Sequence, residues 1–117
     1  MIIETLRHYC LSLPHATEGV QGDSDLLFRL GGKMFAVTNL DGTPTKVSFK
    51  CTPEKFDELI ESAGIIPAPY LARNKWVMVE RLNALNDKEL KALIKHSYDM
   101  LFAKLPKKIK TTLITRS

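Results

Sequence analysis

The sequence predicts a two-layer α+β sandwich in which an antiparallel sheet is covered on one face by helices. Apolar stripes with helical spacing lie near both ends of the chain, and β-type runs separated by turn residues lie between them. The length of 117 residues suits one domain with one core. The expected order of elements is α-β3-α-β2-α.

The helices are expected where apolar periodicity meets a start or stop signal. Residues 2–12 carry apolar side chains at spacings of three and four. The second helix begins at Thr52-Pro53, a hydroxyl N-cap followed by proline at the first helical position. The longest helix begins after Asn86, another N-cap, and its apolar stripe continues to Pro106. Proline ends it, because proline lacks the amide donor that helix continuation needs.

The central strands are expected on both sides of Gly31-Gly32. Residues 26–30 and 33–39 are β-type runs, and two glycines between them suit a type I′ turn, in which both central residues need positive φ. Residues 19–24, rich in glycine and small polar side chains, are expected to form a loop. The hairpin therefore provides the first two of three consecutive strands.

The remaining strands differ in how clearly they are marked. In residues 46–51 apolar side chains alternate with Lys46, Ser48 and Lys50, which predicts one core face and one wet face. Residues 75–82 are the clearest strand. Residues 65–74 contain two prolines and are expected to be strand only at an edge or in part.

The excess positive charge is confined to the end of the chain. Residues 1–103 contain twelve basic and thirteen acidic side chains, and residues 104–117 add five basic and no acidic ones. The whole chain has a formal charge of +4. We therefore divide it into one domain, residues 1–106, and a solvated basic tail, residues 107–117. Attraction to phosphate must come from that tail or from local clustering of cations.

Several function classes find no support in the residues. His8, His15 and His96 lack metal-ligand spacing, and the motifs of phosphate-cradling loops and nucleophile elbows are missing. We therefore expect no enzyme activity, no catalytic residue, no metal and no cofactor. No apolar run has the length of a membrane span, no export signal precedes the domain, and the two cysteines are expected to be reduced. These features predict a cytoplasmic protein without a membrane partner.

Cations and one indole are expected to gather at a rim of the sheet. If the strands pair, the rim brings together Lys33, Lys46, Lys50, Arg73, Lys75 and Trp76. Lys107, Lys108 and Lys110 of the tail would add to the phosphate contacts. Trp76 should be mostly buried against the long helix, with stacking on bases as its other use. The alternative is that strand lysines only protect sheet edges and keep the sheet soluble.

Five stretches resemble the MmcQ/YjbR family of small bacterial proteins. They are YCLSLPHAT (residues 9–17), GGKMFAV (31–37), VSFKCTP (47–53), PYLARNKWV (69–77) and SYDMLFAKLPKK (97–108). They follow the family's order over nearly the whole chain. The chain departs from the family at His15, where members often have glycine, and around residues 20–22, where aromatic residues are common.

The resemblance implies a two-layer fold like that of secretion-chaperone and frataxin-like domains. It also implies DNA binding through a double-wing arrangement of sheet and helices, and it transfers no catalytic residues. We therefore expect a non-enzymatic DNA-binding protein whose binding is weak and salt-sensitive. The alternative is a protein- or peptide-interaction module of the secretion-chaperone type. We expect the protein to be a monomer or a weak dimer.

Overall fold

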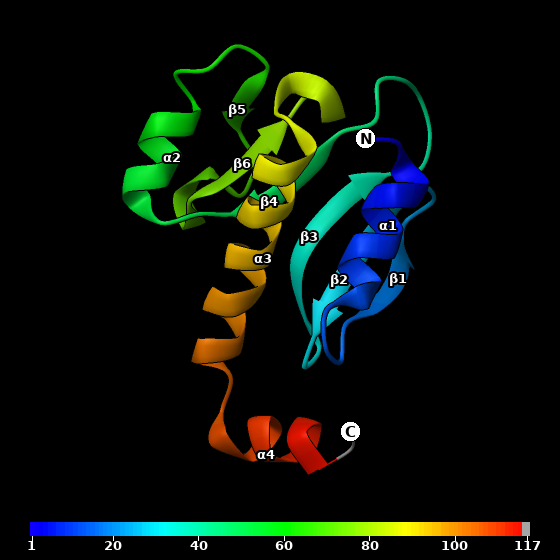
Figure 1. Cartoon of the computed structure of the whole chain (residues 1–117), viewed down its shortest axis with the longest axis vertical. Helices are drawn as coiled ribbons and strands as arrows, with labels where there is room; N and C mark the ends of the chain where they lie inside the picture. Colours follow the sequence, from blue (N-terminus) through cyan, green and yellow to red (C-terminus); the bar gives the residue numbers. More distant parts are fainter. Residues whose placement is uncertain (116–117) are drawn as a thin grey trace.

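The computed structural model describes residues 1–115 and confirms the α+β class, with one antiparallel sheet and helices packed on it (Figure 1). The sheet has six strands in the order β1-β2-β3-β4-β6-β5. The helices are α1 (Ile3–Ser12), α2 (Pro53–Leu59), α3 (Asp87–Lys104) and α4 (Lys107–Thr115), with short 3-10 turns η1 (Ala72–Asn74) and η2 (Leu82–Ala84). The strands are β1 (Thr17–Gln21), β2 (Asp25–Leu30), β3 (Lys33–Asn39), β4 (Val47–Lys50), β5 (Ile65–Pro67) and β6 (Trp76–Val79).

One apolar core joins α1, α2 and α3 to a single face of the sheet. Ala36, Phe49 and Val77 lie side by side on neighbouring strands β3, β4 and β6 and are fully buried. Leu6 of α1 and Ile94 of α3 belong to the same buried cluster. Figure 1 shows α1 in front of β1–β3 and α3 running down the middle of the molecule. Burial of these aliphatic and aromatic side chains is the main stabilising contribution.

The local signals for caps and turns are confirmed. Gly31 and Gly32 have φ values of 60° and 84° in the turn that joins β2 to β3. The side chains of Thr52 and Asn86 accept hydrogen bonds from backbone amides in the first turns of α2 and α3. Both helices therefore begin where a side-chain oxygen satisfies an otherwise unpaired amide.

The strand β1 corrects the expected element order. Residues 17–21 pair along their whole length with β2, and only the turn at residues 22–24 is irregular. The segment has one large apolar side chain, Val20, which is exposed. As an edge strand, β1 needs little apolar surface of its own, because its backbone completes the hydrogen bonds of β2. The observed order is therefore α-β4-α-β2-α-α.

We expected the polar face of β4 to be exposed to solvent, but the structure shows that this face is partly covered. Ser48 is only 4% exposed, although Lys46 beside it is exposed and Lys50 half-buried. Ser48 lines a cavity of about 200 Å³ together with Ala68, Leu71 and other residues. The segment between β5 and β6 therefore covers part of the sheet face that the helices leave free.

Residues 107–115, the described part of the predicted solvated tail, form α4. This helix crosses below the tip of the β2–β3 hairpin (Figure 1). Ile109 and Leu113 are partly buried and pack against the core. A Cβ atom on Gly31 would lie 3.1 Å from side-chain atoms of both Leu105 and Ile109, so the turn and the α3–α4 junction are in close contact. The tail prediction extends to residue 117, and residues 116 and 117 lie outside the described part.

A candidate anion-binding cleft

The sheet opens where β3 and β4 separate, and a serine of α3 fills the opening. β3 and β4 pair only through three residue pairs, from Ala36–Phe49 to Thr38–Val47. Lys50 would oppose Phe35 if the ladder continued. Instead the Ser97 hydroxyl donates to the Phe35 carbonyl at 2.7 Å and accepts from the Lys50 amide at 3.1 Å. Ser97 thus replaces one rung of the sheet and satisfies both backbone groups.

Beyond this opening, α3 continues further than the strand on which it packs. α3 has 18 residues and spans about 27 Å, whereas the four residues of β4 span about 13 Å. The last turns of α3 therefore flank open space, which forms a cleft of about 390 Å³. We call it the β3–α3 cleft; it is lined by Lys33, Met34, Lys50, Asn74, Trp76, Ser97, Met100, Leu101, Lys104 and Leu105.

Among residues 1–115, three lysines and no carboxylate line the β3–α3 cleft. Lys33 and Lys104 are exposed, and Lys50 is half-buried. None of the three has a carboxylate partner within residues 1–115. Burial lowers the pKa of Lys50, and repulsion from the charged Lys104 lowers it further. An anion bound between these ammonium groups would relieve that repulsion.

The rest of the cleft lining is largely apolar. Trp76 is 7% exposed and Leu105 4%, while Met34, Met100 and Leu101 are half-buried. Trp76 lies directly opposite Lys50 in the β4–β6 pairing. The cleft therefore combines cations with an apolar surface large enough for part of a small ligand.

The structure brings together only some of the residues predicted for the rim. Lys33, Lys50 and Trp76 share the β3–α3 cleft, and Trp76 is buried as expected. Lys46 lies beyond the other end of β4, beside a different cavity. Arg73 is exposed on η1, and the Lys75 ammonium lies 5.0 Å from the centre of the Phe56 ring.

The tail lysines continue from the end of α3. Lys107 and Lys108 are exposed on the first turn of α4, three and four residues after Lys104. The Lys110 ammonium instead donates to the Ala103 carbonyl at 3.0 Å and lies 5.6 Å from the centre of the Phe102 ring. Lys110 therefore neutralises the C-terminal end of α3, and Lys107 and Lys108 face solvent.

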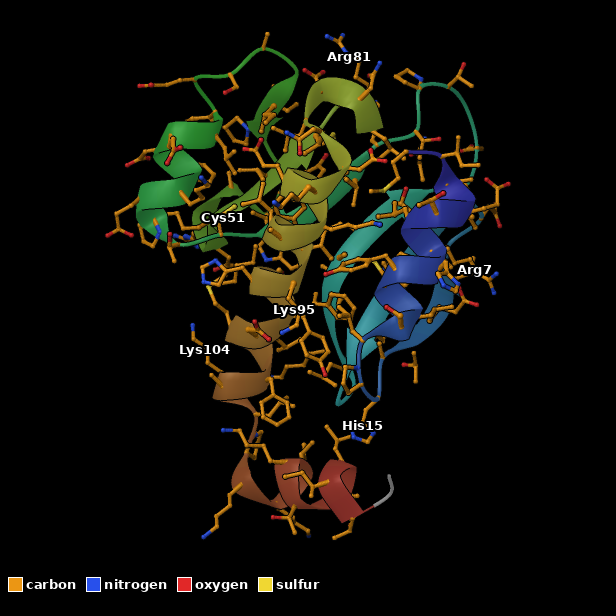
Figure 2. All side chains as sticks on the ribbon, in the orientation of Figure 1. Arg7, His15, Cys51, Arg81, Lys95 and Lys104 are labelled. Atoms are coloured by element: carbon orange, nitrogen blue, oxygen red, sulfur yellow. The ribbon has the colours of Figure 1, made fainter. Side chains whose placement is uncertain are left out.

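Sequence reasoning omitted Lys104 and Asn74 from the site. Figure 2 shows Lys104 on the lower part of α3, on the side away from α1 in this view. A signal for Lys104 was present, because residues 97, 100, 101 and 104 lie on one face of a helix. Asn74 precedes β6 and had no such signal. Its side chain makes no hydrogen bond within the described chain.

Residues 1–115 contain neither a metal-binding cluster nor a membrane-spanning helix. Among residues 1–115, no three His, Cys, Asp or Glu side chains are grouped so that they could hold a metal ion. No helix in that range is both long enough and apolar enough to cross a bilayer. Cys10 and Cys51 are both buried free thiols. Burial raises the pKa of Cys10 to about 12 and that of Cys51 to about 11.

Comparisons with known proteins identify relatives of the chain. The YjbR family model matches residues 11–100. A Deinococcus radiodurans protein, DR2400, with a domain called DUF419, is 28% identical with a TM-score of 0.86, over 96% of this chain and 87% of its own. A Pseudomonas syringae protein, a structural-genomics target named PsR293, shares the fold at 22% identity and a TM-score of 0.71, over 86% of this chain and 98% of its own. No curated protein matches the sequence. Since the family model covers most of the chain, this protein belongs to the YjbR family, also called MmcQ/YjbR.

Proposed function

We propose that this protein is a non-enzymatic, cytoplasmic DNA-binding protein that holds phosphates at the β3–α3 cleft and on the first turn of α4. The observation that carries the proposal is the set of three cleft lysines, for which the described part of the chain provides no opposing carboxylate. Lys107 and Lys108 extend this cationic surface along the chain. Ammonium groups of this kind bind phosphate oxygens without reading base sequence.

The proposal that the protein is not an enzyme rests on the state of its nucleophiles. The Ser97 hydroxyl is buried and occupied by two backbone groups. The raised pKa values of both thiols keep them protonated near neutral pH, and a thiol is a far weaker nucleophile than a thiolate. The cleft serine and the two buried thiols are therefore poor nucleophiles, which favours binding over bond cleavage.

The salt dependence of binding gives the proposal a quantitative form. If the five lysines of the cleft and the first turn of α4 each neutralise one phosphate, the log–log slope on duplex DNA is about −4.5. Affinity should then fall about 500-fold between about 50 and 200 mM salt. Fluorescence anisotropy of a labelled duplex measures this slope directly. No binding at about 50 mM salt with tens of micromolar protein would refute the proposal.

A triple variant separates the cleft from general charge. Replacing Lys33, Lys50 and Lys104 by glutamine should reduce the slope to about −1.8, because two of five phosphate contacts remain. The matched control is Lys46→Gln with Arg81→Gln and Lys88→Gln. These three side chains are exposed, lie outside the cleft, and carry the same total charge. An equal loss of affinity in both variants would show that net charge alone drives binding.

A second candidate function, protein interaction, is supported by the edge of the sheet. β1 is an outer strand, and Val20 and Leu40 beside it are 60% and 46% exposed. An extended segment of another chain could add to this edge by backbone hydrogen bonds. In that case light scattering should detect self-association that survives high salt, and Val20→Glu should abolish it. A strict monomer at all concentrations would argue against this function.

A further inference from the structure

The arrangement of the β3–α3 cleft is more specific than phosphate binding requires. Its most exposed groups are polar and its most buried groups are apolar, and Lys50 is half-buried between them. Lys33, Lys104 and Asn74 are exposed, whereas Trp76 and Leu105 are buried and the two methionines are half-buried. A matching ligand has an anionic part at the opening and a flat apolar part inside.

Duplex DNA cannot use the interior of such a cleft. A double helix presents phosphates on its outside and keeps its bases paired and stacked within it. Phosphate groups alone would contact the lysines and leave the apolar surface in water. An unpaired nucleotide has both parts, because its base offers a π-face and its phosphate stays outside.

We propose that the β3–α3 cleft binds one nucleoside 5′-phosphate unit, with its base inside and its phosphate among the lysines, either in an unpaired strand or as the free compound. The inference rests on the proposed function for its phosphate contacts. Methionine side chains adapt to ligands of different shape, so the cleft should accept any of the bases. The free carboxamide of Asn74 supplies one donor and one acceptor for a base edge at the opening.

The protein carries its own reporter for this site, because Trp76 is its single tryptophan and lines the cleft. Titration with an oligothymidylate, the matching duplex, thymidine 5′-phosphate, thymidine and inorganic phosphate should be followed by Trp76 emission. The single strand and the nucleotide should quench the emission. Calorimetry should give the single strand about 10-fold higher affinity than the duplex, the factor expected from one stacked base. Thymidine and inorganic phosphate should each bind more weakly than the nucleotide.

Two methionine variants test the apolar surface without changing charge. Met100→Gln should reduce the preference for the single strand, because it places a polar amide in the apolar lining that the base would contact. The control is Met78→Gln, because Met78 is also half-buried but lines the separate cavity near Ser48.

Lys50→Met should abolish the response to thymidine 5′-phosphate, since it removes the cation nearest to the interior.

The outcomes distinguish this inference from the proposed function. Equal affinity for single strand and duplex, with no effect of Met100→Gln, would overturn the inference and leave duplex binding standing. If neither nucleic acid binds but the free nucleotide quenches Trp76 in a Lys50-dependent manner, the cleft site is supported and DNA binding is refuted. If none of the probes changes the emission or releases heat, both proposals fail.

Discussion

Ser97→Ala tests whether the Ser97 hydroxyl, as a bridge between β3 and β4, holds these two strands together. The substitution removes the hydroxyl that joins the Phe35 carbonyl to the Lys50 amide, at 2.7 and 3.1 Å. Ser97 is 2% exposed, so water does not replace it freely. A buried polar group left unpaired costs about 1–3 kcal/mol. The Lys50 amide lies closer to the cleft, so leaving it unpaired should cost about 1 kcal/mol. The unpaired Phe35 carbonyl adds about 1–3 kcal/mol, so we expect a total loss of about 2–4 kcal/mol.

Urea denaturation followed by Trp76 emission measures that loss, and thermal melting should show a decrease of about 8–15 °C for a chain of this size. Amide hydrogen exchange at Lys50 gives a local check, because its exchange should accelerate more than that of Phe49. Ser62→Ala is the matched control, because Ser62 is exposed and its side chain makes no hydrogen bond within residues 1–115. A loss below about 0.5 kcal/mol, the size of an ordinary surface substitution, would show that the bridge does not hold the strands.

Four further perturbations test other parts of the structure. Trp76→Ala should cost about 3–5 kcal/mol, because it empties a buried site, and a loss under about 1 kcal/mol in urea would mean that the indole packs poorly. Gly31→Ala should cost about 2 kcal/mol or more, because φ is positive and the methyl group would press on the junction of α3 and α4. Calorimetric melting measures this loss. An unchanged melting temperature would mean that α4 moves away without cost. Lys104→Gln should raise the pKa of Lys50, as measured by NMR of the lysine side chains, and an unchanged pKa would assign its depression to burial alone. Deletion of 107–117 should lower both the melting temperature and the affinity for DNA, and an unaltered melting temperature would contradict the packing of α4 on the core.

The pH dependence linked to Lys50 has a definite sign. Its pKa is lower in the folded chain than its ordinary value of 10.5, so the unfolded chain holds more protons between the two values. Lys50 therefore opposes folding at neutral pH, and this cost disappears as the pH rises through that window. A phosphate bound in the cleft would reduce the same cost, so binding and proton uptake by Lys50 should be coupled.

Most of the fold could be predicted because its signals are local. The glycine pair at 31 and 32, the cap at Thr52 and the long stripe after Asn86 each act within a few residues. β1 lacked such a signal, since its strand character comes from the backbone of β2. α4 was missed because its threonines and isoleucines have β-type composition, although Ile109 and Leu113 are spaced as on one face of a helix.

The site was harder to predict because its cleft depends on relations between distant segments. It exists because β3 leaves β4 after three pairs and because α3 is longer than β4. No periodicity within one segment encodes either fact. The strand pattern indicates Lys33 and Lys50, whereas Lys104 enters the sequence analysis only through the charge of residues 104–117. Lys46 was wrongly grouped with them, because alternation reveals the face of a side chain but not the end of the strand.

The short joint between β3 and β4 has a consequence for how the domain comes apart. Three residue pairs connect the meander β1–β3 to the group β4–β6–β5, and α3 packs across both. Each group of strands can therefore act as a cooperative unit, and α3 contacts both units. Partial opening should begin at this seam, since it costs fewer ladder bonds than any other cut between central strands. The β3–β4 boundary also forms one wall of the cleft, with Lys33 on β3 and Lys50 on β4. A ligand that contacts both lysines would therefore hold the two groups of strands together where the sheet has the fewest residue pairs.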